Sequence, residues 1–187
     1  LHTIPTRRSA DLARAIDAAH GRHIVLDPYE NTATQIQIPT RDDPTKMRSR
    51  FPKTMPRPSN FWGEEVVHAG VSDPHNPMMD EKGRLWATTT VSETLPDWCK
   101  EGSSNKYAAY YPATNPSNRH ASVYDPKTGR FELIYTCFGT HHLQFGEDPD
   151  AMLYFSGGGA TIPWVNTKVY DQTKDEKAAV GWCPTVI

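Results

Sequence analysis

The sequence predicts an all-β fold that is built from repeated antiparallel hairpins. Three observations support this: short apolar segments alternate with polar residues at the two-residue period of a strand, turns rich in Asp, Pro and Gly separate them, and pairs of hairpins recur along the chain. The chain has 187 residues and 10% aromatic residues, which is enough to form a core. We therefore expect a folded β protein and not a disordered chain.

The clearest hairpin spans residues 121–135. Its turn is Asp-Pro-Lys-Thr-Gly at 125–129, where Asp and Pro favour the turn and Gly129 accommodates a positive φ. The segment Val-Leu-Asp-Pro at 25–28 opens a similar unit, and Val-Tyr-Asp at 169–171 is expected to begin a third, degenerate copy of it.

A second type of hairpin alternates with the first. In both copies a strand leads through an acidic turn to a second strand that carries an aromatic residue, at 75–89 and again at 142–156. Residues 20–38 are predicted to be the last two strands of a preceding unit, and residues 141–171 the first three strands of the next. One complete unit is therefore predicted to have four strands, at 75–79, 84–89, 120–124 and 130–136.

A four-stranded antiparallel unit with recurring aromatic residues is typical of a β-propeller blade. Blades usually run about 40 to 50 residues, and the excess here falls in two Pro-rich stretches at 41–73 and 90–118, which we expect to be long loops. The prediction is one complete blade with a partial blade on each side. A ring needs more blades, so we expect the remaining blades of the same protein as partners.

The first residues are interpreted separately. Residues 1–12 are expected to be a non-native or disordered leader, and 13–187 a fragment of one propeller domain. The alternative is a genuine polar helix at 11–19, whose residues are compatible with a helix.

Two segments carry a resemblance to a known family. The sequence HNPMMDEKGRLWATT at 75–89 resembles the repeat of the streptogramin B lyase family (virginiamycin B lyase-like propellers), and ASVYDPKTGRFELIYT at 121–136 resembles the outer hairpin of that family and of YVTN-type propellers. The resemblance covers about residues 20–187. The chain departs from the pattern at Ala87, where the family has Phe after Trp.

The resemblance implies a possible activity. In the lyases, a divalent cation, usually Mg²⁺, and a histidine open a lactone by elimination at the central face of the propeller. On this reading the cofactor is a divalent cation, Mg²⁺ or Ca²⁺, and the ligand is a small molecule or a glycan.

His75 and His142 are the leading catalytic candidates. They hold equivalent positions before the first strand of successive blades, so both are expected to face the same central channel. Histidine transfers protons near neutral pH and binds metals, so the pair could share a cation or flank a substrate. The alternative is that each closes a hydrogen bond to the backbone of a neighbouring blade. Four more residues are candidates for substrate contact, namely Asn76, Thr140, His141 and Trp98.

The acidic residues between the paired strands have a simpler interpretation. Asp80, Glu81, Glu147, Asp148 and Asp150 lie in turns, where turn geometry explains Asp, although clustered carboxylates could also hold Ca²⁺. In the strands that follow, Trp86 and the pair at 154–155 are expected to be core aromatics.

The three cysteines form no Cys-x-x-Cys motif. A Cys99–Cys137 disulfide would fasten the 90–118 insertion over the channel mouth and contribute about 3 to 4 kcal/mol in the chain-entropy treatment. It would require an oxidising compartment, which makes the protein periplasmic or secreted, with cytoplasmic placement as the alternative. Cys183 would then be free or paired with a cysteine outside this sequence, and the alternative is three reduced thiols.

Two functions are compatible with these patterns. The first is a lyase or hydrolase that acts on a lactone or cyclic ester. The second is a non-catalytic propeller that binds a small molecule, a glycan or a protein through the loops at 41–73 and 90–118. The near-neutral charge of −2 argues against nucleic-acid binding. The sequence has no apolar run long enough to predict a membrane span. It also lacks the Gly-x-Ser-x-Gly motif, which argues against an α/β-hydrolase.

Overall fold

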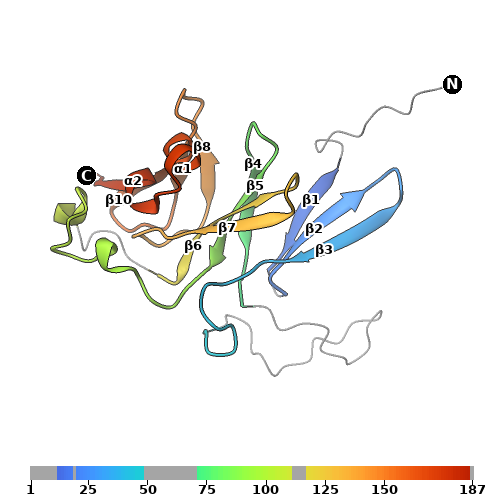
Figure 1. The fold of residues 1–187 in the computed structure, drawn as a ribbon, viewed down its shortest axis with the longest axis horizontal. Coiled ribbons are helices and arrows are strands. Elements are labelled where there is room, and N and C mark those ends of the chain that lie inside the picture. Colours follow the sequence, from blue (N-terminus) through green and yellow to red (C-terminus); the bar gives the residue numbers. More distant parts are fainter. Residues whose placement is uncertain (1–11, 19, 49–70, 111–116, 186–187) are drawn as a thin grey trace.

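The computed structural model describes residues 12–18, 20–48, 71–110 and 117–185 (Figure 1). Within these residues the chain forms three antiparallel sheets that lie in chain order, and none of them closes into a barrel. The prediction of an all-β fold is therefore confirmed. The leader expected at 1–12 lies outside the described residues, apart from Leu12, as do parts of both long loops.

The strands of each sheet follow one another as a meander. The first sheet consists of β1 (Ala13–Asp17), β2 (Arg22–Asp27) and β3 (Thr32–Gln37). The second consists of β4 (His75–Met79), β5 (Leu85–Thr90), β6 (Arg119–Asp125) and β7 (Arg130–Ile134). The third consists of β8 (Leu143–Phe145), β9 (Met152–Phe155), β10 (Thr161–Asn166) and β11 (Val180–Pro184).

The second sheet contains the four strands predicted from the hairpin pattern, in the predicted order. Its turn chemistry is as expected, because the Asp125 side chain accepts a hydrogen bond from the Lys127 amide and Gly129 has a φ of 69°. Alternation along β6 sends Val123 into the core, opposite Trp86 of β5.

Two local expectations are wrong. Residues 13–17 form strand β1, so the alternative of a helix at 11–19 does not hold. Residues 169–171, expected to begin a strand, lie in helix α1 (Thr167–Thr173), because Asn166 ends β10 and caps the helix by accepting a hydrogen bond from the Val169 amide.

A second short helix connects α1 to the last strand of the third sheet. Asp175 caps α2 (Glu176–Ala179), which runs directly into β11. The third sheet therefore has four strands and not the three expected for a partial unit.

The hydrophobic core lies between the second and third sheets. It is centred on Trp86 and Trp182, which are both fully buried, and is filled by side chains from both sheets and from the connections between them. The first sheet contributes no residue to this core among the part of the chain that the structure describes.

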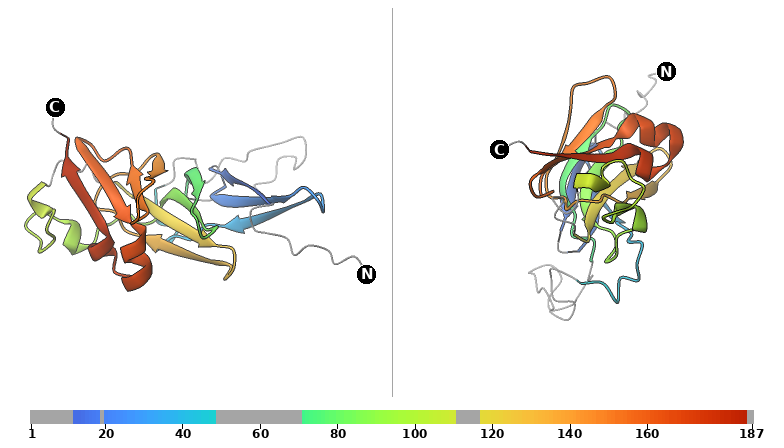
Figure 2. Two further views of the ribbon diagram at one scale, coloured as in Figure 1. Left: turned by 90° about the horizontal axis from the view of Figure 1, so that it is seen from above. Right: turned by 90° about the vertical axis from the view of Figure 1, so that its left-hand side faces the viewer.

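The three sheets follow one another along the long axis of the molecule (Figure 2). Strand β4 lies beside β8 in the next sheet and beside β1 in the previous one, so the first strands of neighbouring sheets come together. The first and second sheets also meet where the His23 ring packs edge-on against Tyr124.

The described part of the 90–118 insertion packs on the third sheet. It contains the 3₁₀ helices η2 (Asp97–Cys99) and η3 (Ala108–Tyr110). Tyr107 contacts both Trp164 and Trp182, and Gly181 lets the aromatic rings approach the backbone, since a Cβ there would lie 2.6 Å from the Trp164 ring. Among the residues described, no helix has the length and apolar character needed to cross a membrane.

Candidate functional site

Three histidines cluster where β4 and β8 begin. His75 is the first residue of β4, and His141 and His142 directly precede β8. One ring nitrogen from each lies within 4.8 Å of the others, and the ring centroids of His75 lie 4.4 Å from His141 and 4.9 Å from His142. The structure therefore brings together the two histidines that were expected to share a site and adds His141 to them.

The side chain of Thr88 in β5 contacts the backbone of this cluster. The buried Thr88 hydroxyl lies 2.7 Å from the His141 carbonyl oxygen and 3.2 Å from that of His75, so one side chain connects the two sheets. Arg119 donates in turn to the Thr88 hydroxyl oxygen at 3.1 Å. This network fixes the distance between the backbones of His75 and His141.

The third sheet fixes the other side of the cluster. The Ser156 hydroxyl accepts a hydrogen bond from the His142 amide at 3.0 Å, and the Ser156 carbonyl accepts one from the His141 amide at 2.9 Å. Gly157 follows with a φ of 93°, and a Cβ there would lie 3.2 Å from the His141 nitrogen. The positive φ therefore favours glycine at this position, and a side chain there would be tightly packed against His141.

His75 has a lowered pKa. Burial lowers its pKa first, the neighbouring His141 and His142 lower it further, and nearby Arg119 adds to this while Asp73 opposes it. Its Nε2 atom is buried and has no hydrogen-bond partner within the described residues. At neutral pH the ring is therefore unprotonated, with a nitrogen available to accept a proton or bind a metal.

An ion pair compensates the cation beside the cluster. The Arg119 guanidinium contacts the Asp73 carboxylate at 2.6 Å, and both side chains are largely buried. The Asp73 carboxylate thus offsets the positive charge of Arg119 beside the three imidazoles.

The other expected site residues have different surroundings. The Asn76 side-chain oxygen accepts a hydrogen bond from the Leu143 amide at 2.6 Å, which fastens β4 to the start of β8. The buried Thr140 hydroxyl donates to the His120 carbonyl oxygen. Trp98 packs against the hydrophobic core, and no described hydrogen bond or ring contact joins it to the histidines. Asn76 and Thr140 thus support the backbone near the cluster.

Cys99 and Cys137 form a disulfide, with Cα atoms 4.9 Å apart and both residues fully buried. Cys183 in β11 is unpaired and partly exposed. The disulfide joins the insertion to the segment that leads from β7 to the histidines, and the described insertion contacts the third sheet through Tyr107.

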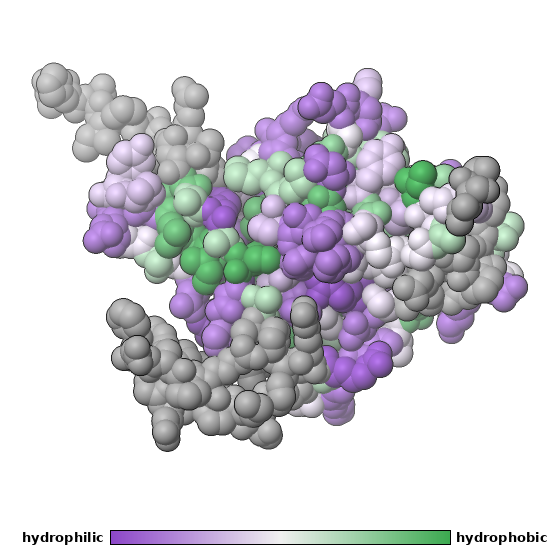
Figure 3. Space-filling model, turned by 180° about the vertical axis from the view of Figure 1, so that it is seen from behind, coloured by the Kyte–Doolittle hydropathy of each residue, from purple (hydrophilic) through white to green (hydrophobic). Residues whose placement is uncertain are grey.

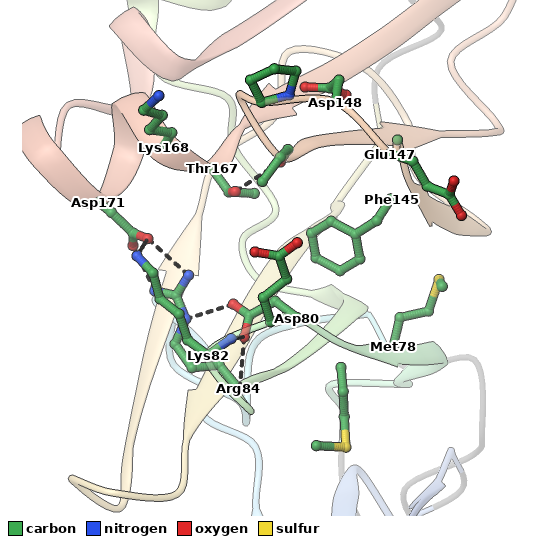
Figure 4. A pocket seen from close by; sticks show the side chains of 15 residues that line it. Met78, Asp80, Lys82, Arg84, Phe145, Glu147, Asp148, Thr167, Lys168 and Asp171 are labelled. Atoms are coloured by element: carbon green, nitrogen blue, oxygen red, sulfur yellow. Dashed lines mark hydrogen bonds and ion pairs between the residues drawn. The ribbon is translucent and has the colours of Figure 1, made fainter. Parts of the chain in front are cut away.

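A second feature, at the opposite end of β4, was missed by sequence reasoning. A cavity of about 650 Å³ opens between the β4–β5 turn, the β8–β9 turn and α1 (Figure 4). Arg84 bridges Asp80 at 2.7 Å and Asp171 at 2.6 Å, and Lys82 also contacts Asp171. The sequence pattern predicts a strand at 169–171, so it gives no indication that Asp171 lies in a helix beside Arg84.

The acidic turns are explained by their own hydrogen bonds. Asp80 accepts from the Lys82 and Arg84 amides and from the Trp86 indole, and Asp148 accepts from the Asp150 and Met152 amides. These carboxylates therefore serve the turns and the ion pairs, as turn chemistry predicted.

Mg²⁺ and Ca²⁺ fit the histidine cluster poorly. Both are hard cations that select oxygen ligands, whereas this cluster presents imidazole nitrogens, and the nearby Asp73 carboxylate is engaged by Arg119.

No known protein family, no curated protein and no solved structure matches this chain.

Proposed function

We propose that the chain is part of a β-propeller-like enzyme that opens a lactone or cyclic ester at the His75–His141–His142 cluster. The observation that carries this proposal is the convergence of three histidines at adjacent first strands, with an unprotonated ring and a buried, unpartnered nitrogen at His75. The fold supports it, because successive four-stranded meanders with neighbouring first strands are the arrangement of propeller blades.

The reaction that suits this cluster is an elimination. His75 or His142 accepts a proton from the carbon next to the one that bears the ester oxygen. A carbon–carbon double bond forms, the carbon–oxygen bond breaks, and its electrons leave on a carboxylate, so no separate oxidant or reductant is needed. A neutral imidazole beside a buried surface is the appropriate proton acceptor near pH 7.

The test is turnover of a panel of lactones and cyclic depsipeptides by the full chain, followed by release of acid and by mass spectrometry. An elimination leaves the substrate mass unchanged, whereas hydrolysis adds one water. We expect His142→Ala to abolish turnover, because it removes one of the three converging imidazoles. Since this side chain is exposed, its removal should have little effect on folding. The matched variant His20→Ala should retain turnover. Turnover that survives both His142→Ala and His75→Gln, or no turnover of any substrate by the unmodified chain, contradicts the proposal.

One observation favours a second candidate, a non-catalytic binding module. The first residues of the two long connections contact each other. The Ser92 hydroxyl donates a hydrogen bond to the Asp42 carboxylate, and the Arg41 amide donates one to the Val91 carbonyl. Such paired loops can bind a small molecule, a glycan or a protein. Saturable binding that survives His142→Ala but is lost when the loops are shortened would establish this function.

The same proposal includes partners and location. An apolar surface covers part of the face formed by the first sheet (Figure 3), and Leu26 of β2 is 42% exposed. A preceding blade of the same protein would bury this face. The buried disulfide favours the periplasm or secretion, because disulfides persist in oxidising compartments.

A further inference from the structure

We infer that His75, His141 and His142 form a binding site for a transition-metal ion of the imidazole-preferring class, with Zn²⁺ foremost, and not for Mg²⁺ or Ca²⁺. The inference goes beyond the proposed reaction, because it concerns an ion that binds in the absence of any substrate. An imidazole nitrogen that binds the ion cannot also accept a proton, so the proposed elimination belongs to the chain without the ion.

The donor set supports this choice of ion. Three imidazole nitrogens suit Zn²⁺, Cu²⁺, Ni²⁺ and Fe²⁺, and three protein ligands are the number found in catalytic zinc sites, where the fourth position holds water or substrate. The histidines also come from two neighbouring sheets, so an ion held by all three would cross-link them.

The distances need only a small adjustment. A tetrahedral zinc ion with bonds of about 2.0–2.1 Å places its nitrogen ligands roughly 3.3 Å apart. The ligand atoms here lie within 4.8 Å of one another, and His141 and His142 are exposed. Rotation of these two side chains therefore brings the nitrogens into place without disturbing the core.

The supporting residues hold the ligand backbones ready. Thr88 fixes the His75 and His141 carbonyls, and Ser156 fixes the His141 and His142 amides. These contacts fix the backbone positions of the three histidines before an ion binds. The charge of Arg119 is offset by Asp73, so the cluster does not repel a cation strongly.

The test is direct binding of Zn²⁺, Co²⁺ and Mg²⁺ to the full chain, measured by isothermal titration calorimetry, with the visible absorption of bound Co²⁺ as a report on ligand geometry. We expect one Zn²⁺ per cluster, a Co²⁺ spectrum of tetrahedral or five-coordinate form, and no heat with Mg²⁺. His142→Gln and His141→Gln should each weaken Zn²⁺ binding at least tenfold, while His20→Gln leaves it unchanged.

Two outcomes overturn the inference. One is Zn²⁺ affinity that is the same in the unmodified chain and in both exposed-histidine variants, and the other is Mg²⁺ binding that competes with Zn²⁺ at the same site. Because both variants replace exposed side chains, thermal unfolding verifies that they are folded. Zn²⁺ binding without lactone turnover would contradict the proposed function alone, and turnover without Zn²⁺ binding would contradict this inference alone.

Discussion

His120 illustrates how burial sets the chemistry of single residues. It is fully buried in β6, where its Nδ1 accepts a hydrogen bond from the Thr136 amide at 3.1 Å and its ring packs edge-on against Tyr135. Burial lowers its pKa to about 4, with Arg41 adding to the effect and Asp42 opposing it. Burial lowers the pKa of His23 to about 4 as well.

The depressed pKa of His120 predicts a pH-dependent loss of stability. Well above pH 6.5 the ring is neutral in both the folded and unfolded states, so its titration does not reduce the free energy of unfolding. As the pH falls from 6.5 toward 4, the unfolded chain binds a proton that the folded chain refuses, so the free energy of unfolding decreases by at most about 3 kcal/mol per buried histidine. Urea unfolding at pH 7 and pH 4.5 measures this change.

The control for this prediction is a comparison of His120→Gln with His20→Gln. The first variant should show a smaller difference between the two pH values, and the second should behave like the unmodified chain. An unchanged pH dependence in His120→Gln would show that the group responsible lies elsewhere.

At the scale of elements, the disulfide is the main covalent constraint on the 90–118 insertion. Cys99 and Cys137 are separated by 38 residues. Replacing both with alanine should lower the free energy of unfolding by about 3 to 4 kcal/mol in the chain-entropy treatment. Guanidinium unfolding measures the loss, and Cys183→Ala, which removes the unpaired cysteine, is the matched control. A loss below about 1 kcal/mol would mean that packing of Tyr107 against Trp182 already fixes the insertion.

A second element-scale prediction concerns the attachment of α1 to the β4–β5 turn. The Arg84 guanidinium donates two hydrogen bonds to the Asp171 carboxylate, at 2.6 and 2.9 Å. Burial opposes ionisation of Asp171, but the hydrogen bonds from Arg84 and Lys82 outweigh it and hold the pKa of Asp171 below its ordinary value.

A double-mutant cycle with Arg84→Met and Asp171→Asn should therefore give a coupling energy of about 1 to 3 kcal/mol. The matched control is the pair formed by Lys168 and Asp150, which are 3.7 Å apart and more than half exposed, for which the coupling should be near zero. Equal coupling in the two pairs would contradict the structural role assigned to Arg84.

At the scale of the whole molecule, stability is distributed unevenly. The core lies between the second and third sheets, and the first sheet contributes nothing to it within the described ranges. We therefore expect hydrogen exchange to be fastest in β1–β3 and slowest in β5 and β11, which carry Trp86 and Trp182. Local opening requires less energy where fewer apolar contacts break. Exchange measured by mass spectrometry tests this order, and equal protection of all three sheets would contradict it.

The sequence predicted the second sheet almost completely for a local reason. Turn residues such as Asp125 and Gly129 and the two-residue alternation of the flanking strands specify a hairpin without help from distant parts of the chain. The same pattern predicted that His75 and His142 occupy equivalent positions, which the structure brings within reach of each other.

Other features could be decided only by tertiary contacts. The segment at 169–171 reads as a strand by its residues, yet the cap at Asn166 and burial of Tyr170 make it helical. The stacking of the His141 ring on the His75 ring depends on contact between two sheets, which the hydrogen bond from Thr88 to the His141 carbonyl also joins. The sequence by itself determined the class of fold and the hairpins, because these follow from local periodicity and turn chemistry. The tertiary structure decided which side chains meet, because packing between sheets joins residues that no local pattern relates.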